Sequence, residues 1–126
     1  MSARVLVVDD DNDNLGLVTH MLARRGYEVV TATDGVGALA TVERERPDVI
    51  LLDIVMPEMD GIQVLDRIRA QARSASIPII LVTARSHDED VLAGYKYGAD
   101  YYITKPFTEE QLLHGIELIL KAYEAH

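Results

Sequence analysis

Charged residues follow three of the apolar runs in this sequence. They are Asp9 and Asp10 after residues 5–8, Asp53 after residues 49–52, and Lys105 after residues 101–104. A carboxylate at the end of a buried strand is costly unless a cation or a reaction accounts for it. If these runs are strands of one parallel sheet, their carboxyl ends form one shared site.

Carboxylates crowded in this way need positive charge nearby. Two like charges about 4 Å apart repel by about 4 kcal/mol at an effective dielectric of about 20, so the group either takes up protons or recruits a cation. Lys105 supplies one charge, and hard carboxylate oxygens suit Mg²⁺. Aspartate can attack a phosphoryl group, and a divalent ion would neutralise the charge of an acyl phosphate on Asp53. Thr83 ends a fourth apolar run, from which its hydroxyl could reach a phosphoryl oxygen.

Five apolar runs alternate with stretches of helical periodicity along the chain. The runs do not alternate polar with apolar residues, which is typical of strands covered on both faces. Strict strand and helix alternation favours a parallel sheet with helices on both sides, so we predict a doubly wound α/β fold. Helix starts are expected at residues 11–13, at Asp60, and at a capping box over residues 108–111.

Composition bounds the function further. The chain has 126 residues, a net charge of -9 and no cysteine. This length predicts a single domain over residues 1–126. The negative charge argues against direct nucleic-acid binding, and the lack of cysteine excludes thiol chemistry. No run approaches the length of a membrane span, so we expect a cytoplasmic protein that does not bind membranes.

Five motifs stand at the positions discussed above: Val8-Asp9-Asp10, Leu51-Leu52-Asp53-Ile54-Val55-Met56-Pro57, Asp60-Gly61, Val82-Thr83-Ala84 and Lys105-Pro106-Phe107. Together they resemble the receiver domain of two-component response regulators, in particular its chemotaxis-regulator-like members. The resemblance spans essentially the whole chain and implies a five-stranded flavodoxin-like sheet of order 2-1-3-4-5 with five helices on its two faces.

The resemblance also implies roles for individual residues. Asp53 would be the phosphoacceptor, and Lys105 would bind a phosphoryl oxygen. Asp10, Asp53 and the backbone carbonyl of Val55 would ligate Mg²⁺, with Asp9 acting through a metal-bound water. Thr83 and Tyr102 would form the switch pair that remodels the face of helix four, strand five and helix five. The Lys105-Pro106 peptide bond is similar to one that is often cis in the family.

Two positions that vary in the family are expected to set the lifetime of the phosphoryl group. Val55 and Arg85 lie two residues beyond Asp53 and Thr83, respectively. Our hypothesis is that apolar Val55 obstructs the attacking water and that Arg85 covers or pairs with the phosphate.

The sequence therefore predicts a signalling switch rather than a metabolic enzyme. It would take a phosphoryl group from a sensor histidine kinase or a histidine phosphotransfer protein, and would catalyse only its own phosphorylation and dephosphorylation. A phosphorylation-dependent homodimer through helices four and five stays open. The alternatives are a docking module that has lost phosphorylation and, less favoured, a flavodoxin-type electron carrier. The latter needs a phosphate-binding loop where this chain has Asp9-Asp10-Asp11.

Overall fold

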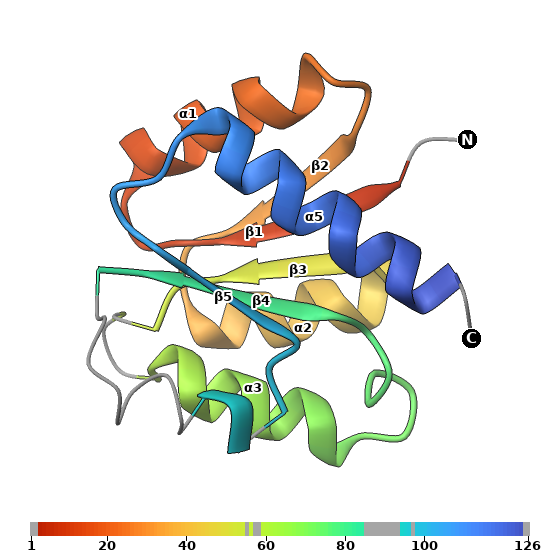
Figure 1. Ribbon diagram of the computed structural model, residues 1–126. Helices are drawn as coiled ribbons and strands as arrows, with labels where there is room; N and C mark the ends of the chain where they lie inside the picture. The colour runs from red at the N-terminus through yellow and green to blue at the C-terminus, as the bar shows by residue number, and fades with distance from the viewer. Residues whose placement is uncertain (1–2, 55, 57–58, 85–93, 97, 125–126) are drawn as a thin grey trace.

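The computed structural model describes residues 3–54, 56, 59–84, 94–96 and 98–124, with only the backbone described at 83 and 124. Strands and helices alternate along these residues (Figure 1). The elements are β1 (Arg4–Val8), α1 (Asn12–Ala23), β2 (Glu28–Ala32), α2 (Gly35–Glu45), β3 (Val49–Leu52), α3 (Gly61–Ala70), β4 (Ile79–Thr83), β5 (Tyr101–Thr104) and α5 (Glu109–Glu124).

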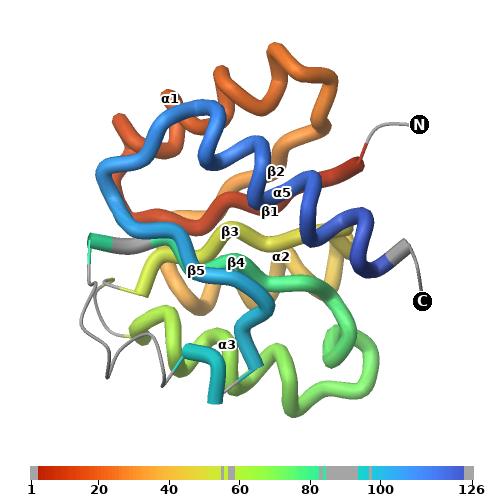
Figure 2. The backbone as a smooth tube through the Cα atoms, viewed as in Figure 1, coloured from red at the N-terminus to blue at the C-terminus, as the bar shows by residue number. Residues whose placement is uncertain are grey.

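The sheet confirms the predicted topology. Its order is β2-β1-β3-β4-β5, and every neighbouring pair is parallel. α1 and α5 lie on one face and α2 and α3 on the other (Figure 1). The tube in Figure 2 shows that β1 starts and α5 finishes at one end of the sheet, opposite the edge where the parallel strands end.

Successive strand residues enter two separate cores, which is why the apolar runs are continuous. In β1, Val5 and Val7 pack with residues of α1 and α5, whereas Leu6 and Val8 pack with residues of α2 and α3. All four β3 residues are buried. A strand with helices on both faces has no side that faces solvent. This burial explains the continuous apolar runs from which the doubly wound fold was predicted.

Side chains cap the helices where the sequence indicated. Asp11 is the N-cap of α1, and Asp60 forms a reciprocal capping box with Gln63 at α3. Thr108 and Gln111 exchange the same pair of hydrogen bonds before α5, at 3.1 and 2.9 Å. Each cap satisfies backbone N–H groups that the first helical turn leaves unpaired.

Two boundaries add detail to the sequence pattern. The fourth apolar run begins at Ile77, yet β4 begins at Ile79, because Pro78 has no N–H to donate and contributes only its carbonyl, which accepts from Ile50 N at 3.0 Å. The alternation of strands and helices also requires a fourth helix between β4 and β5. Residues 94–96 are helical, and the preceding part lies outside the described residues.

Candidate functional site

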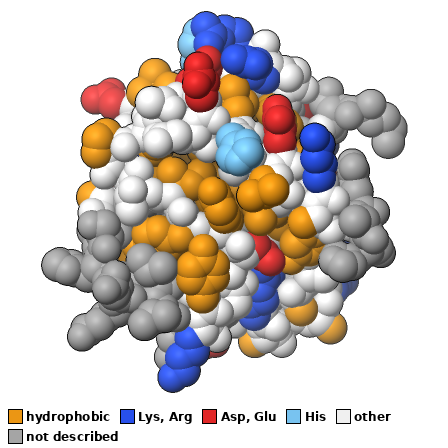
Figure 3. Space-filling model, in the orientation of Figure 1, with side chains coloured by type: hydrophobic (Ala, Val, Ile, Leu, Met, Phe, Trp, Pro, Cys, Tyr) orange, Lys and Arg blue, Asp and Glu red, His pale blue; other side chains and the backbone are white. Residues whose placement is uncertain are grey.

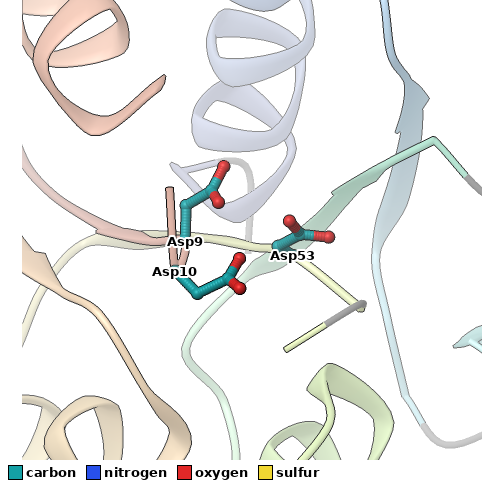
Figure 4. A group of neighbouring side chains, drawn as sticks. All are labelled: Asp9, Asp10 and Asp53. Carbon is teal, nitrogen blue, oxygen red and sulfur yellow. The ribbon is translucent and has the colours of Figure 1, made fainter. Parts of the chain in front are cut away.

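The three aspartates meet at the carboxyl ends of β1 and β3, which are neighbouring strands. Backbone hydrogen bonds extend the sheet past both strands, from Asp9 N to Ala32 O at 3.2 Å and from Asp53 N to Val8 O at 3.0 Å. One carboxylate oxygen from each of Asp9, Asp10 and Asp53 lies within 4.8 Å of the others, and Figure 4 shows the three side chains gathered there. The structure thus brings together the acidic group that the sequence predicted.

Lys105 neutralises part of this cluster from the end of β5. Its ammonium donates to Asp9 Oδ2 at 2.9 Å and to Asp53 Oδ2 at 3.2 Å. Burial on its own lowers the pKa of Lys105, but the hydrogen bond that Lys105 donates to Asp9 and the charge of Asp53 outweigh it, so the pKa is raised from its usual 10.5. The lysine is therefore charged at neutral pH, and the site holds a permanent cation.

Asp9 and Asp10 differ in their surroundings. Asp9 is 7% exposed, and both of its oxygens accept hydrogen bonds, Oδ1 from Asp11 N at 3.0 Å and Oδ2 from Lys105 and from Asn14 Nδ2 at 3.4 Å. Asp10 is exposed to solvent. Asp9 is thus fixed by protein donors, while Asp10 faces the solvent.

Sequence reasoning missed Asn14. Its amide reaches Asp9 because α1 begins at Asn12 and turns the side chain of its third residue back over the strand end. Asn12 is also an asparagine, two positions earlier. The sequence does not show which of the two asparagines reaches Asp9 until the first residue of the helix is known. A precise N-cap at Asp11 would have been the only signal.

The remaining predicted site residues are described in part. The backbone of Thr83 pairs with Thr104, immediately before Lys105, so it lies at the same edge of the sheet. The Lys105-Pro106 bond is cis, as the resemblance implied. Val55 and Arg85 lie outside the described residues, as does the side chain of Thr83.

Tyr102 lies on β5, partly buried against the core cluster of α2 and α3. It also lines a surface pocket of about 230 Å³. Figure 3 shows this side of the molecule, with hydrophobic side chains gathered near the centre of the view and charged ones mainly around them. The predicted switch residue therefore connects the core with an open surface. The pocket is formed by Tyr101, Tyr102, Ile103, Thr104, Pro106, Gln111 and His114.

The fold and the site define a class of protein: a doubly wound α/β domain with an acidic centre and a paired lysine at the carboxyl edge of its sheet. The family model of the response regulator receiver domain matches residues 5–117. The chain belongs to this family. Receiver domains are signalling switches of two-component systems and are not classical enzymes.

Similar curated proteins fall into two length classes. The chain is 40% identical to the alkaline phosphatase synthesis transcriptional regulatory protein PhoP of Bacillus subtilis, over 98% of this chain and 51% of that protein. It is 39% identical to protein PilH of Pseudomonas aeruginosa, over 94% of this chain and 98% of that protein. The chain thus spans about half the length of PhoP and of several other regulators it matches, and nearly all of PilH.

Solved structures show the same fold. Chemotaxis protein CheY4 of Vibrio cholerae superposes with a TM-score of 0.91 at 37% identity, covering 94% of this chain and 99% of that one. The receiver domain of a sensor histidine kinase from Pseudomonas aeruginosa has a TM-score of 0.88 at 31% identity, over 96% and 99% of the two chains, and holds a magnesium ion in its active-site cleft. Within the described part of this chain, no helix has the length and apolar character needed to cross a membrane.

Proposed function

We propose that this receiver domain accepts a phosphoryl group on Asp53 in a Mg²⁺-dependent reaction. The observation that carries the proposal is the environment of the Asp53 carboxylate. Its residue is 7% exposed, Lys105 Nζ lies 3.2 Å away, and two further carboxylates lie within 4.8 Å. A buried carboxylate beside both a cation and a candidate divalent site is suited to nucleophilic attack on phosphorus.

The donor set fits Mg²⁺. All the candidate side-chain ligands are carboxylate oxygens, which this hard cation prefers, and exposed Asp10 leaves room for the waters that Mg²⁺ retains. Asp10, Asp53 and the Val55 carbonyl would hold the ion directly, and Asp9 would act through a water. When bound, Mg²⁺ would neutralise negative charge on the transferring phosphoryl group.

The reaction itself needs little covalent machinery from the chain. A carboxylate oxygen of Asp53 forms the new bond to phosphorus, while the P–N bond of a phosphohistidine donor breaks and its electron pair returns to the imidazole nitrogen. Lys105 moves with its charge to a phosphoryl oxygen, a short step from its present position beside Asp53. The donor would be a sensor histidine kinase or a histidine phosphotransfer protein.

The consequences of phosphorylation belong to the same proposal. Thr83 would respond to the phosphoryl group and Tyr102 would turn inward, which changes the face built by helix four, β5 and α5. Val55 and Arg85 would set the lifetime of the phosphoryl group. A downstream protein would recognise the changed face, and a phosphorylation-dependent homodimer is one form that this recognition could take.

Mass spectrometry after incubation with phosphoramidate and Mg²⁺ tests the site. This small donor carries the same P–N bond as phosphohistidine. Wild type should gain one phosphoryl group, and Asp53→Ala should gain none. Asp66→Asn is the matched control, because Asp66 is an exposed carboxylate on α3 and should leave labelling unchanged. Equal labelling of Asp53→Ala and wild type would refute the site, and an unlabelled wild type would favour a docking module without phosphorylation.

A further inference from the structure

A second charged cluster lies at the opposite end of β5 from the phosphorylation site. We call it the Asp100 cluster, made of Arg69 at the end of α3, Asp100 just before β5, and Tyr123 in the last turn of α5. Asp100 Oδ2 accepts from Arg69 Nη2 at 2.9 Å, and Asp100 Oδ1 accepts from the Tyr123 hydroxyl at 2.7 Å. Three segments far apart in the sequence are thus tied to one carboxylate.

The same cluster also grips the backbone. Ile79 N, at the start of β4, donates to Asp100 Oδ2 at 2.8 Å. Arg69 donates further to Gly98 O at 3.0 Å and to Ile77 O at 2.6 Å. The side chains of Arg69 and Asp100 are only 18% and 23% exposed, so these charge-assisted bonds are partly shielded from water. The proposed phosphoryl chemistry uses none of them.

β5 runs directly between the two charged clusters. Asp100 precedes its first residue and Lys105 follows its last, a separation of five residues or about 16 Å in an extended chain. All four β5 residues are paired in register with β4, so the strand contains no bulge or unpaired residue. α5 runs back along the sheet so that its last turn reaches the end where β5 begins (Figure 1).

We propose that β5 couples the two clusters, so that loss of the Lys105–Asp53 pair on phosphorylation weakens the hold of Asp100 on the last turn of α5. This inference rests on the proposed function. In the structure, the Lys105–Asp53 pair and the Asp100 cluster belong to one arrangement of β5. Lys105 would follow the phosphoryl oxygens when Asp53 is phosphorylated, and in this proposal its shift is passed along β5 to the end that Asp100 anchors.

Coupling of this kind is reciprocal. If the Asp100 cluster favours the arrangement with the Lys105–Asp53 pair, then weakening the cluster favours the arrangement without that pair. A phosphoryl mimic on Asp53 must then bind more tightly when the Tyr123 hydroxyl is removed. Tyr123→Phe removes only this hydroxyl and keeps the ring in the last turn of α5.

Titration of isotope-labelled protein with beryllofluoride and Mg²⁺, followed by NMR, tests whether the Asp100 cluster affects binding at Asp53. Tyr123→Phe should lower the Kd for beryllofluoride about fivefold or more. Tyr27→Phe is the matched control. Tyr27 packs against the core that the sheet forms with α1 and α5, and its hydroxyl forms no hydrogen bond with the described residues. Its Kd should equal that of wild type.

The Ile79 amide, which donates to Asp100, reports the reverse effect: how the Lys105–Asp53 pair influences the Asp100 cluster. This measurement needs no phosphoryl mimic. Lys105→Met keeps the aliphatic chain and removes the charge, and should speed hydrogen exchange at Ile79 about fivefold or more. Equal Kd values for Tyr123→Phe and Tyr27→Phe, with unchanged Ile79 exchange in Lys105→Met, would overturn the coupling and leave the proposed function standing. A wild type that binds no beryllofluoride would overturn both.

Discussion

At the scale of single residues, aspartate side chains have different surroundings in the two charged clusters. Asp9 and Asp100 each accept hydrogen bonds from several protein donors, and such carboxylates orient their partners. Asp10 is exposed, and Asp53 lies buried beside Lys105. Of the three carboxylates in the site, Asp10 is therefore the one whose exposure leaves room for a ligand.

The hydroxyl of Tyr123 predicts an alkaline weakening of the fold. Burial, followed by the hydrogen bond to Asp100 and the charge of Asp100, raises the pKa of Tyr123 from 10.0 to about 12. Between these values the unfolded chain loses the phenol proton and the folded chain keeps it, so stability falls as pH rises from about 10 to about 12. The full difference equals about 2.7 kcal/mol, and at 38% exposure solvent screening reduces the expected loss to about 1 kcal/mol.

Urea unfolding of wild type and Tyr123→Phe at several pH values measures this loss. The difference in free energy of unfolding between the two proteins should be constant below about pH 10 and shrink above it, because phenylalanine cannot ionise. Other tyrosines and Lys105 titrate in both proteins and cancel in the difference. A difference that stays flat up to about pH 12 would show that Tyr123 is not held by Asp100.

The two clusters were not equally visible in the sequence. Asp9, Asp10, Asp53 and Lys105 all follow apolar runs, so the rule that parallel strands end at one edge was enough to bring them together. Asp100 precedes its strand, and its partners lie at helix ends where Arg and Tyr are common surface residues. Only the packing of α3 and α5 against the sheet brings those partners to it.

At the scale of elements, the position of Asp53 depends on how closely α3 approaches the end of β3. Gly61 begins α3 and donates to Ile54 O at 2.9 Å. A Cβ at this glycine would lie 2.2 Å from Asp53 O and 2.7 Å from Ile54 Cα. Both are backbone atoms, which cannot rotate away, so any side chain there must push α3 from the strand end.

Gly61→Ala should therefore be destabilising by about 2 to 4 kcal/mol, and should also slow phosphorylation by phosphoramidate. Gly16→Ala is the matched control, because a Cβ at Gly16 in α1 meets nothing within 4 Å. It should instead be stabilising by about 0.5 to 1 kcal/mol, since alanine is the better helix former. Thermal unfolding compares the two, and a harmless Gly61→Ala would mean that α3 can shift freely.

The sequence predicted these elements better than their contacts. Apolar runs located the strands, and Asp60 and Thr108 marked helix starts because a capping side chain acts within one turn. The approach of Gly61 to Asp53 involves two different elements and depends on the angle at which α3 packs. No local pattern carries that angle, so the close contact emerged only from the fold.

At the scale of the whole molecule, part of the negative charge is concentrated at one site and the rest is spread over the chain. The net charge is -9, and Asp9, Asp10 and Asp53 place three carboxylates within one small site. General repulsion weakens with any salt, whereas crowding at the site is relieved by a specific ion. The two effects therefore separate when different salts are compared at equal ionic strength.

Sodium chloride should raise the free energy of unfolding gradually, and magnesium chloride at the same ionic strength should raise it further. A single bound ion stabilises by about 2.7 kcal/mol when its concentration is 100 times its Kd. Asp10→Asn should be more stable than wild type without Mg²⁺, because one repelling charge is gone, and should lose most of the extra Mg²⁺ effect while keeping the response to sodium chloride. Urea unfolding by circular dichroism measures all three. If the two salts act alike on wild type, screening alone explains the stabilisation, and the acidic cluster at the ends of β1 and β3 does not bind Mg²⁺.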